Sequence, residues 1–214
     1  MKRILTIVTI LALLCGCSAS ESEADTLAQE RAALAEEYEA LDENSLFYAG
    51  TQETLEKLLE HGTGVIFLSF PECLWCQGYI GQLNDVLSEA GIEKAMYYNI
   101  LKDRQEMNDW YRSIASYIEE QDETILGWTN EGDPMLYVPL VLFVENGQII
   151  GWDNETSMEV TSDTNTPETY WTEEKKTALH DKLYALAAEV AKAQSVNDST
   201  GCDEACSFTP SSSN

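Results

Sequence analysis

Short apolar runs separated by longer periodic stretches predict that this chain folds as an α/β domain. The runs at 65–70 and 139–144 are almost continuously apolar and have the length of strands buried on both faces of a sheet. Asn146–Gly147, a pair typical of tight hairpin turns, joins the second of these runs to the strand that follows it. Shorter runs rich in β-branched and aromatic residues predict the remaining strands, at 45–49, 94–101 and 149–152.

Between these strands, apolar residues recur every three or four positions, which is the period of an α-helix with one buried face. The first such helix is either a stalk in front of the domain or a helix packed on it. The segments 124–136 and 153–170 lack a clear period and are predicted to be connections. Because strands alternate with helices, we expect a central mixed sheet flanked by helices. The pattern predicts helices at 26–41, 51–62, 73–91, 103–120 and 172–193.

This alternation divides the chain into four parts. Residues 45–193 form the predicted α/β domain, and residues 18–44 form a polar tether followed by an acidic helix. Residues 1–17 have the pattern of an export signal. Residues 194–214 are predicted to be a flexible polar tail that carries a pair of cysteines.

The N-terminal segment predicts export and lipid anchoring. Lys2 and Arg3 precede the apolar run 4–14, which is too short to span a bilayer comfortably. Leu14–Cys15–Gly16–Cys17 then resembles the lipobox of bacterial lipoproteins, in which the peptide is cut before a cysteine that receives a diacylglycerol. The resemblance makes Cys17 the lipidated residue and implies a protein anchored to the membrane rather than spanning it. Plain secretion and an uncleaved anchor are the alternatives.

The chain is strongly acidic, with 38 acidic and 12 basic residues and a net charge of −26. Such a charge repels nucleic acid and anionic lipid headgroups, so nucleic acid is not an expected partner. The apolar fraction of 44% is high enough for a hydrophobic core.

Apart from two cysteines in the signal, the cysteines fall in two close pairs. Cys73–Leu74–Trp75–Cys76 directly follows a predicted buried strand and opens a helix, whereas Cys202 and Cys206 lie in the tail. A helix N-terminus stabilises a thiolate, and the thiolate is the form of cysteine that attacks a disulfide. The first pair is therefore a predicted redox-active dithiol, with Cys73 as the exposed nucleophile and Cys76 as the resolving thiol.

The order strand, Cys-x-x-Cys, helix, strand, helix, Pro-led strand, hairpin and helix resembles the thioredoxin superfamily over residues 45–193. In that family a cis proline faces the dithiol, and the residue before it offers backbone hydrogen bonds to an extended substrate. The resemblance assigns these positions to Pro139 and Val138. It also suggests that Trp75 shields the dithiol or gives a hydrophobic docking surface. No cofactor and no metal are expected.

Several residues depart from the pattern of that family and leave the direction of electron transfer open. Phe67 stands where many members carry a buried acid that serves proton transfer, and no histidine lies between the cysteines. Glu72 precedes the first cysteine, and its negative charge would oppose the thiolate if it points inward.

Other interpretations of the cysteines stay open. In the first, Cys73 and Cys76 form a structural disulfide in a non-catalytic accessory or peptide-binding protein. In the second, these two cysteines bind zinc together with Cys202 and Cys206. For Cys202 and Cys206, an auxiliary disulfide is favoured over a role as internal redox partner of Cys76. The accessory interpretation has its own loose resemblance, to thioredoxin-like proteins associated with bacteriocin export, in Phe70–Pro71–Glu72–Cys73, Val138–Pro139–Leu140–Val141 and Asn146–Gly147.

Taken together, the sequence predicts an extracytoplasmic thiol–disulfide oxidoreductase that is anchored to the bacterial cell membrane through Cys17. Its expected substrates are exported proteins that carry thiols or disulfides. It would also need a membrane or extracytoplasmic redox partner that restores the working state of the dithiol.

Overall fold

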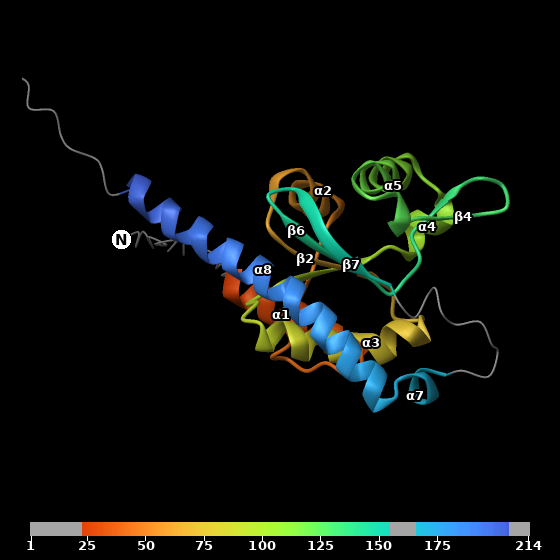
Figure 1. Ribbon diagram of the computed structural model, residues 1–214, viewed down its shortest axis with the longest axis horizontal. Coiled ribbons are helices and arrows are strands. Elements are labelled where there is room, and N and C mark those ends of the chain that lie inside the picture. Colours follow the sequence, from red (N-terminus) through yellow and green to blue (C-terminus); the bar gives the residue numbers. More distant parts are fainter. Residues whose placement is uncertain (1–22, 155–165, 206–214) are drawn as a thin grey trace, which may run out of the picture.

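The computed structural model describes residues 23–154 and 166–205, so the predicted signal and Cys17 lie outside this part of the chain. A five-stranded mixed sheet flanked by helices forms the centre of the molecule (Figure 1), which confirms the expected α/β class. The order across the sheet is β1-β3-β2-β6-β7; β1, β3 and β2 are parallel, and β6 and β7 each run antiparallel to the preceding strand. Its strands are β1 (Phe47–Ala49), β2 (Gly64–Ser69), β3 (Ala95–Asn99), β6 (Leu140–Glu145) and β7 (Gln148–Asp153).

A short 3-10 turn (Glu123–Ile125) and a two-stranded hairpin of β4 (Gly127–Trp128) and β5 (Pro134–Met135) precede β6. Over residues 23–154 and 166–205, no helix combines the length and the apolar character that crossing a membrane requires. The helices are α1 (Glu23–Glu37), α2 (Gln52–His61), α3 (Leu74–Glu89), α4 (Leu101–Glu106), α5 (Asp109–Gln121), α7 (Pro167–Tyr170) and α8 (Glu173–Ala205).

Each face of the sheet has its own hydrophobic core, because successive residues of a strand point to opposite faces. In β2, Val65 and Phe67 belong to the core under α1, α3 and α8, whereas Ile66 and Leu68 belong to the core under α2 and α5. Every residue of β2 is buried, as the continuous apolar run at 65–70 predicts for a central strand.

The N-terminal helix α1 packs on the domain and is not a stalk in front of it. Leu34 of α1 is buried, and so are Tyr38 and Leu41 in the turn that follows the helix. These three side chains share one core cluster with residues of α3 and α8. The helix expected within residues 18–44 therefore contributes to the domain core.

The single helix predicted at 103–120 is in fact two helices, because the chain turns at Met107 and Asn108. Met107 has a left-handed φ of 46°, and the Asn108 side chain caps α5 by accepting a backbone hydrogen bond from its first turn. Asn108 also donates to the buried carboxylate of Asp103, with 2.7 Å between Nδ2 and Oδ1. The Tyr98 hydroxyl and a glutamine amide of α2 donate to the same carboxylate at 2.6 and 2.9 Å. A polar cluster thus fixes the break between the two helices.

Three further segments differ from the prediction. The expected connection at 124–136 contains the β4–β5 hairpin. The connection at 153–170 ends in α7, which has Thr166 as its N-cap residue and Pro167 at its first position. The last helix continues to Ala205, past the predicted start of the tail at residue 194.

Candidate functional site

A disulfide between Cys73 and Cys76 lies at the N-terminus of α3. Cys73 is the N-cap residue of that helix, and its Sγ accepts a hydrogen bond from the backbone N–H of Cys76 at 3.2 Å. The Cα atoms of the two cysteines are 5.2 Å apart, within the usual range for a disulfide. The sulfur of Cys73 therefore faces the unpaired N–H groups and the positive end of the helix dipole, as the sequence predicts.

The two sulfurs differ in their access to solvent. Cys76 is fully buried and belongs to the core under α1, α3 and α8, whereas Cys73 is only partly buried and packs against that core from outside. Of the two cysteine residues, Cys73 is thus the one that a group from another molecule can reach. This asymmetry agrees with the predicted roles of nucleophile and resolving thiol.

The loop before β6 reaches the same end of the sheet as the disulfide. The Val138–Pro139 peptide bond is cis, as the family resemblance implies. Because β6 runs antiparallel to β2 with Leu140 opposite Leu68, Pro139 lies beside the carboxyl end of β2, from which the chain leads directly to Cys73. Pro139 is buried and Val138 half-buried. Sheet register therefore brings together the two segments that the sequence assigns to the site.

Arg104 of α4 links these two segments, although nothing in the sequence points to it. Its guanidinium lies over the Phe70 ring, 5.0 Å from the centroid, in the turn that leads to Cys73. Nη1 also donates a hydrogen bond to the carbonyl of Leu136, just before the Val138–Pro139 step, at 3.2 Å. Burial lowers the pKa of the Arg104 guanidinium. Its contact with the two segments depends on packing between distant parts of the chain, which periodicity does not reveal.

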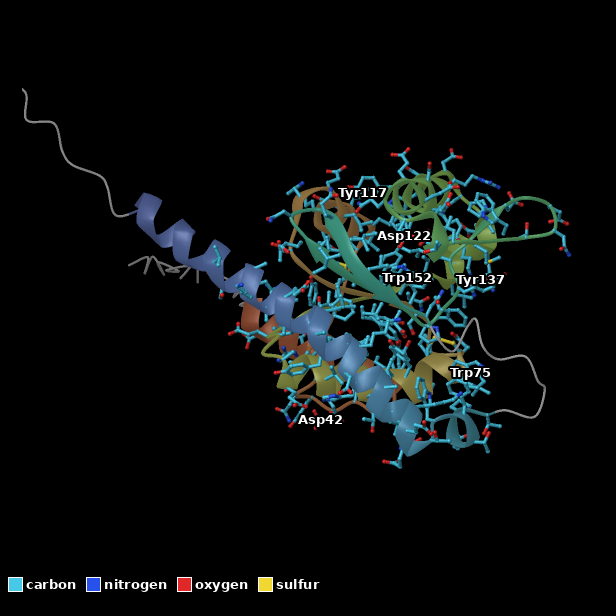
Figure 2. The ribbon with its side chains drawn as sticks, in the orientation of Figure 1. Asp42, Trp75, Tyr117, Asp122, Tyr137 and Trp152 are labelled. Atoms are coloured by element: carbon cyan, nitrogen blue, oxygen red, sulfur yellow. A yellow bond between two sulfur atoms is a disulfide. The ribbon has the colours of Figure 1, made fainter. Side chains whose placement is uncertain are left out.

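The two residues between the cysteines have different surroundings. Trp75 is half-buried, and its ring meets the Tyr170 ring edge-on at a centroid distance of 5.4 Å, close to the yellow sulfur atoms in Figure 2. Leu74 is 71% exposed, an unusual position for a large apolar side chain. The docking role predicted for Trp75 stays a prediction, and the more exposed apolar surface of the motif belongs to Leu74.

A hydroxyl cluster fixes the end of β2 just before the motif. The Tyr38 hydroxyl and Ser69 Oγ are 2.8 Å apart, and the Tyr38 hydroxyl also donates to that of Tyr97 at 3.4 Å. Burial raises the pKa of Tyr38 to about 12, so its hydroxyl is protonated at neutral pH. The turn after α1 therefore supports the strand that leads to the disulfide.

A buried carboxylate lies in the same row of the sheet as Phe67. The register places Phe67 opposite Val141, and Val141 opposite Asp153 of β7. Asp153 is fully buried; it accepts hydrogen bonds from the Tyr79 hydroxyl of α3 at 2.8 Å and from Lys182 Nζ of α8 at 2.7 Å. The acid is thus two strands away from the position at which the family carries one, and it ties α3 and α8 to the sheet.

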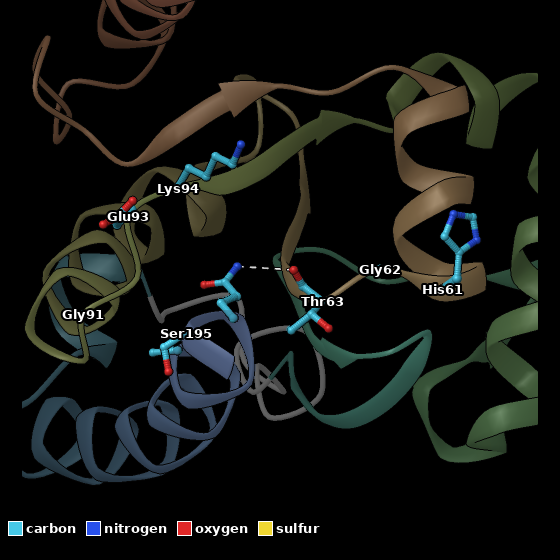
Figure 3. Close-up of a pocket in the computed structure, with 9 residues that line it drawn as sticks. His61, Gly62, Thr63, Gly91, Glu93, Lys94 and Ser195 are labelled. Carbon is cyan, nitrogen blue, oxygen red and sulfur yellow. Dashed lines mark hydrogen bonds between the residues drawn. The ribbon is translucent and has the colours of Figure 1, made fainter. Parts of the chain in front are cut away.

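A separate cleft of about 580 Å³ lies at the opposite end of the sheet (Figure 3). Its lining includes His61, Thr63, Lys94 and Ser195, and a glutamine amide of α8 donates to the Thr63 carbonyl at 3.2 Å across it. Thr63 precedes β2, whereas the disulfide follows β2, so the length of that strand, about 20 Å, separates the two places. The cleft is not part of the disulfide site.

The other predicted site residues cannot be placed. Cys17 and Cys206 lie outside the described residues, and at Cys202, near the end of α8, the backbone alone is described. In the described parts of the chain, no group of three or more His, Cys, Asp and Glu side chains is placed to hold a metal ion. The first cysteine pair is joined as a disulfide.

Comparison of this chain with models of protein families finds no match, and comparison with curated proteins finds none either.

Proposed function

We propose that this protein is a thiol–disulfide oxidoreductase that acts through Cys73 and Cys76. The observation that carries the proposal is the disulfide at the start of α3, with Cys73 accessible and Cys76 buried in the core. A purely structural disulfide needs neither a helix N-terminus nor an accessible sulfur, whereas exchange with another molecule needs an accessible sulfur and is favoured by the helix N-terminus, which stabilises the thiolate.

A thioredoxin-like fold is the finer part of the proposal. The strand order β1-β3-β2-β6-β7, the placement of the cysteines after β2 and the cis proline before β6 support it. The position of the cysteines and the cis proline agree with what the sequence resemblance implies for residues 45–193.

The exchange follows from the accessibility of the two sulfurs. A substrate thiolate attacks Sγ of Cys73, the S–S bond breaks, and its electron pair stays on Sγ of Cys76, which takes up a proton. A second substrate thiolate then attacks the substrate sulfur of this mixed disulfide, and Cys73 leaves as a thiolate. The substrate dithiol is oxidised to a disulfide, and the protein disulfide is reduced to a dithiol, with two electrons transferred.

The reverse sequence reduces a substrate disulfide. Cys73 attacks one substrate sulfur as a thiolate, and the other substrate sulfur leaves as a thiolate. Cys76 then loses its proton and attacks Sγ of Cys73, which forms the protein disulfide again and releases the second substrate thiolate. In both directions Cys73 is a thiolate at one step, as the leaving group or as the attacking group, and the N–H of Cys76 points at its sulfur. The reduction potential of the substrate pair relative to that of Cys73 and Cys76 sets the direction.

Trapping of the mixed disulfide tests this assignment of roles. In the full chain, Cys76→Ser should accumulate mixed disulfides at Cys73 with disulfide-containing proteins, because the Cys73 thiolate attacks their disulfides and no resolving thiol remains to release them. Cys73→Ser should trap none, since Cys76 is buried. Mass spectrometry of the peptide around residues 73–76 identifies the adduct. Equal trapping by both variants contradicts the roles. Failure of native protein to undergo reversible reduction of the pair favours the structural-disulfide alternative.

The proposed location is the outer face of the bacterial cell membrane, with Cys17 as the lipidated residue. The substrates would then be exported proteins, and a membrane or extracytoplasmic partner would restore the working redox state. Metabolic labelling with an alkyne fatty acid tests the anchor, since label should enter the wild-type chain and be absent from Cys17→Ser. Label in both chains would place the lipid elsewhere.

A further inference from the structure

A hollow of about 540 Å³ lies beside the disulfide, on the side of α3 that faces α7 and the turn after α1. Leu74 and Gly78 of α3, Ala40 of the turn, and Pro167 at the start of α7 form its apolar surface. Leu74 directly follows Cys73 in the chain, so a molecule whose sulfur is joined to Cys73 lies within reach of this hollow.

Contacts within the protein fix the segments that form the hollow. The Gln77 amide donates to the carbonyls of Glu37 and Pro71 at 2.8 and 2.9 Å, which joins the end of α1 to the turn before the cysteines. Pro167 packs closely on Gly78: a Cβ added to Gly78 would lie 2.6 Å from the Pro167 Cβ. The hollow is therefore a formed feature of the surface, and binding in it requires little ordering of the protein.

The charged groups that line the hollow are all negative. Exposed carboxylates of Glu39 and Glu168 line it from two different segments, and none of its lining residues is basic. A hydrogen bond from the Thr166 side chain lowers the pKa of Glu168, so this carboxylate is ionised at neutral pH. Apolar walls with carboxylates on two sides fit a side chain that has an apolar stem and a positive head, which describes arginine and lysine.

We propose that this hollow is a substrate subsite that receives an arginine or lysine close in sequence to the reacting cysteine. The inference rests on the proposed function and adds a substrate class to it: cysteine-containing polypeptides with a basic residue beside the cysteine. The stem of that residue would lie on Leu74 and Pro167, and its head between Glu39 and Glu168.

The test uses reduced full-length protein with Cys76→Ser, in which the mixed disulfide at Cys73 persists, and two short peptide disulfides, each a symmetric dimer, that are identical except for Arg or Gln next to the cysteine. The rate at which Cys73 forms a mixed disulfide is followed by acid quenching and mass spectrometry of the peptide that contains it. At low salt, the arginine peptide should react about fivefold faster than the glutamine peptide, which is the size expected for two exposed ion pairs. This ratio should approach one in 0.5 M salt, because exposed charges are screened.

Two double variants with the same change in net charge separate the hollow from the overall acidity of the protein. In E39Q/E168Q the ratio of the two rates should fall toward one. In E120Q/E123Q, which changes exposed residues at the end of α5 and in the turn after it, the ratio should stay near fivefold. Equal rates for the two peptides in the protein without these double changes, or an equal loss of the ratio in the two double variants, would overturn the subsite.

A small uncharged disulfide, bis(2-hydroxyethyl) disulfide, applied to the same Cys76→Ser protein, reports separately on the proposed function. If it forms a mixed disulfide at Cys73 and the peptides show no preference, the subsite alone is wrong. If it leaves Cys73 unmodified, the oxidoreductase proposal fails and the subsite falls with it.

Discussion

Removal of the Tyr79 hydroxyl probes the buried carboxylate that joins α3 to the sheet. Asp153 has no exposed surface, and the Tyr79 hydroxyl donates to its Oδ2 at 2.8 Å, whereas the partner on the other oxygen, Lys182, is half exposed. Tyr79→Phe keeps the ring and therefore its contacts with Phe67, which stacks on it with centroids 5.9 Å apart. The substitution removes the hydroxyl and with it the hydrogen bond to the buried Asp153 carboxylate.

The expected loss of stability follows from the burial of that charge. A hydrogen bond to an ionised group contributes about 1.5–3 kcal/mol, and a buried acceptor that loses its donor cannot turn to water instead. We therefore expect Tyr79→Phe to lower the free energy of unfolding by about 2 kcal/mol. For a chain of this size, that loss corresponds to a decrease in Tm of about 4–8 °C.

Urea unfolding at neutral pH, followed by far-ultraviolet circular dichroism with the disulfide intact, measures this loss. Tyr184→Phe is the matched control, because Tyr184 lies on α8 and is 39% exposed. Its free energy of unfolding should stay within about 0.5 kcal/mol of the wild-type value. If Tyr79→Phe is as stable as that control, the hydroxyl does not stabilise Asp153 and the reasoning from burial is wrong.

Three further perturbations test other parts of the structure. The hydrogen bond of His180 to the Glu89 carboxylate, at 2.9 Å, raises the pKa of this histidine; in NMR titration Glu89→Gln should move it back toward about 6.5, and an unchanged value would contradict the contact. Because the pKa is raised in the folded state, this contact stabilises the protein below the unfolded pKa, and its contribution is lost as the pH rises through the folded pKa. Asp103→Ala removes the acceptor of three side-chain donors and should cost about 2–4 kcal/mol in urea unfolding; a loss below 1 kcal/mol would show that water replaces the carboxylate. Gly78→Ala should cost about 1–3 kcal/mol by pushing Pro167 away from α3, and an unchanged midpoint would mean that α7 moves freely.

The sheet and the position of the cysteine pair could be predicted because local patterns determine them. The apolar run of β2 is central and buried, and a cysteine before an amphipathic stretch marks a helix start. The Val138–Pro139 step was assigned through resemblance, and the cis bond is present. Each of these features is encoded by a few neighbouring residues, so it can be recognised from the sequence alone.

The remainder depends on contacts between distant segments. The helical spacing of apolar residues continues through Met107 and Trp110. The pattern therefore gives no sign of the break between α4 and α5, which depends on the hydrogen bond between Asn108 and the buried Asp103. Thr166–Pro167 is a readable helix start that the prediction did not use. By contrast, nothing in the sequence around the end of β7 shows that Asp153 is buried or that the Tyr79 hydroxyl donates a hydrogen bond to it.

The core under α3 is closed by residues from both ends of the domain, from Leu34 in α1 to Val190 in α8. During translation these residues are synthesised in order from the N-terminus. Until α8 has been made, the cluster that contains Cys76 is incomplete, so the difference in exposure between the two sulfurs has not been established. The selectivity of Cys73 is thus acquired only after α8 has been synthesised, and a chain that still lacks α8 would expose both thiols to any oxidant present.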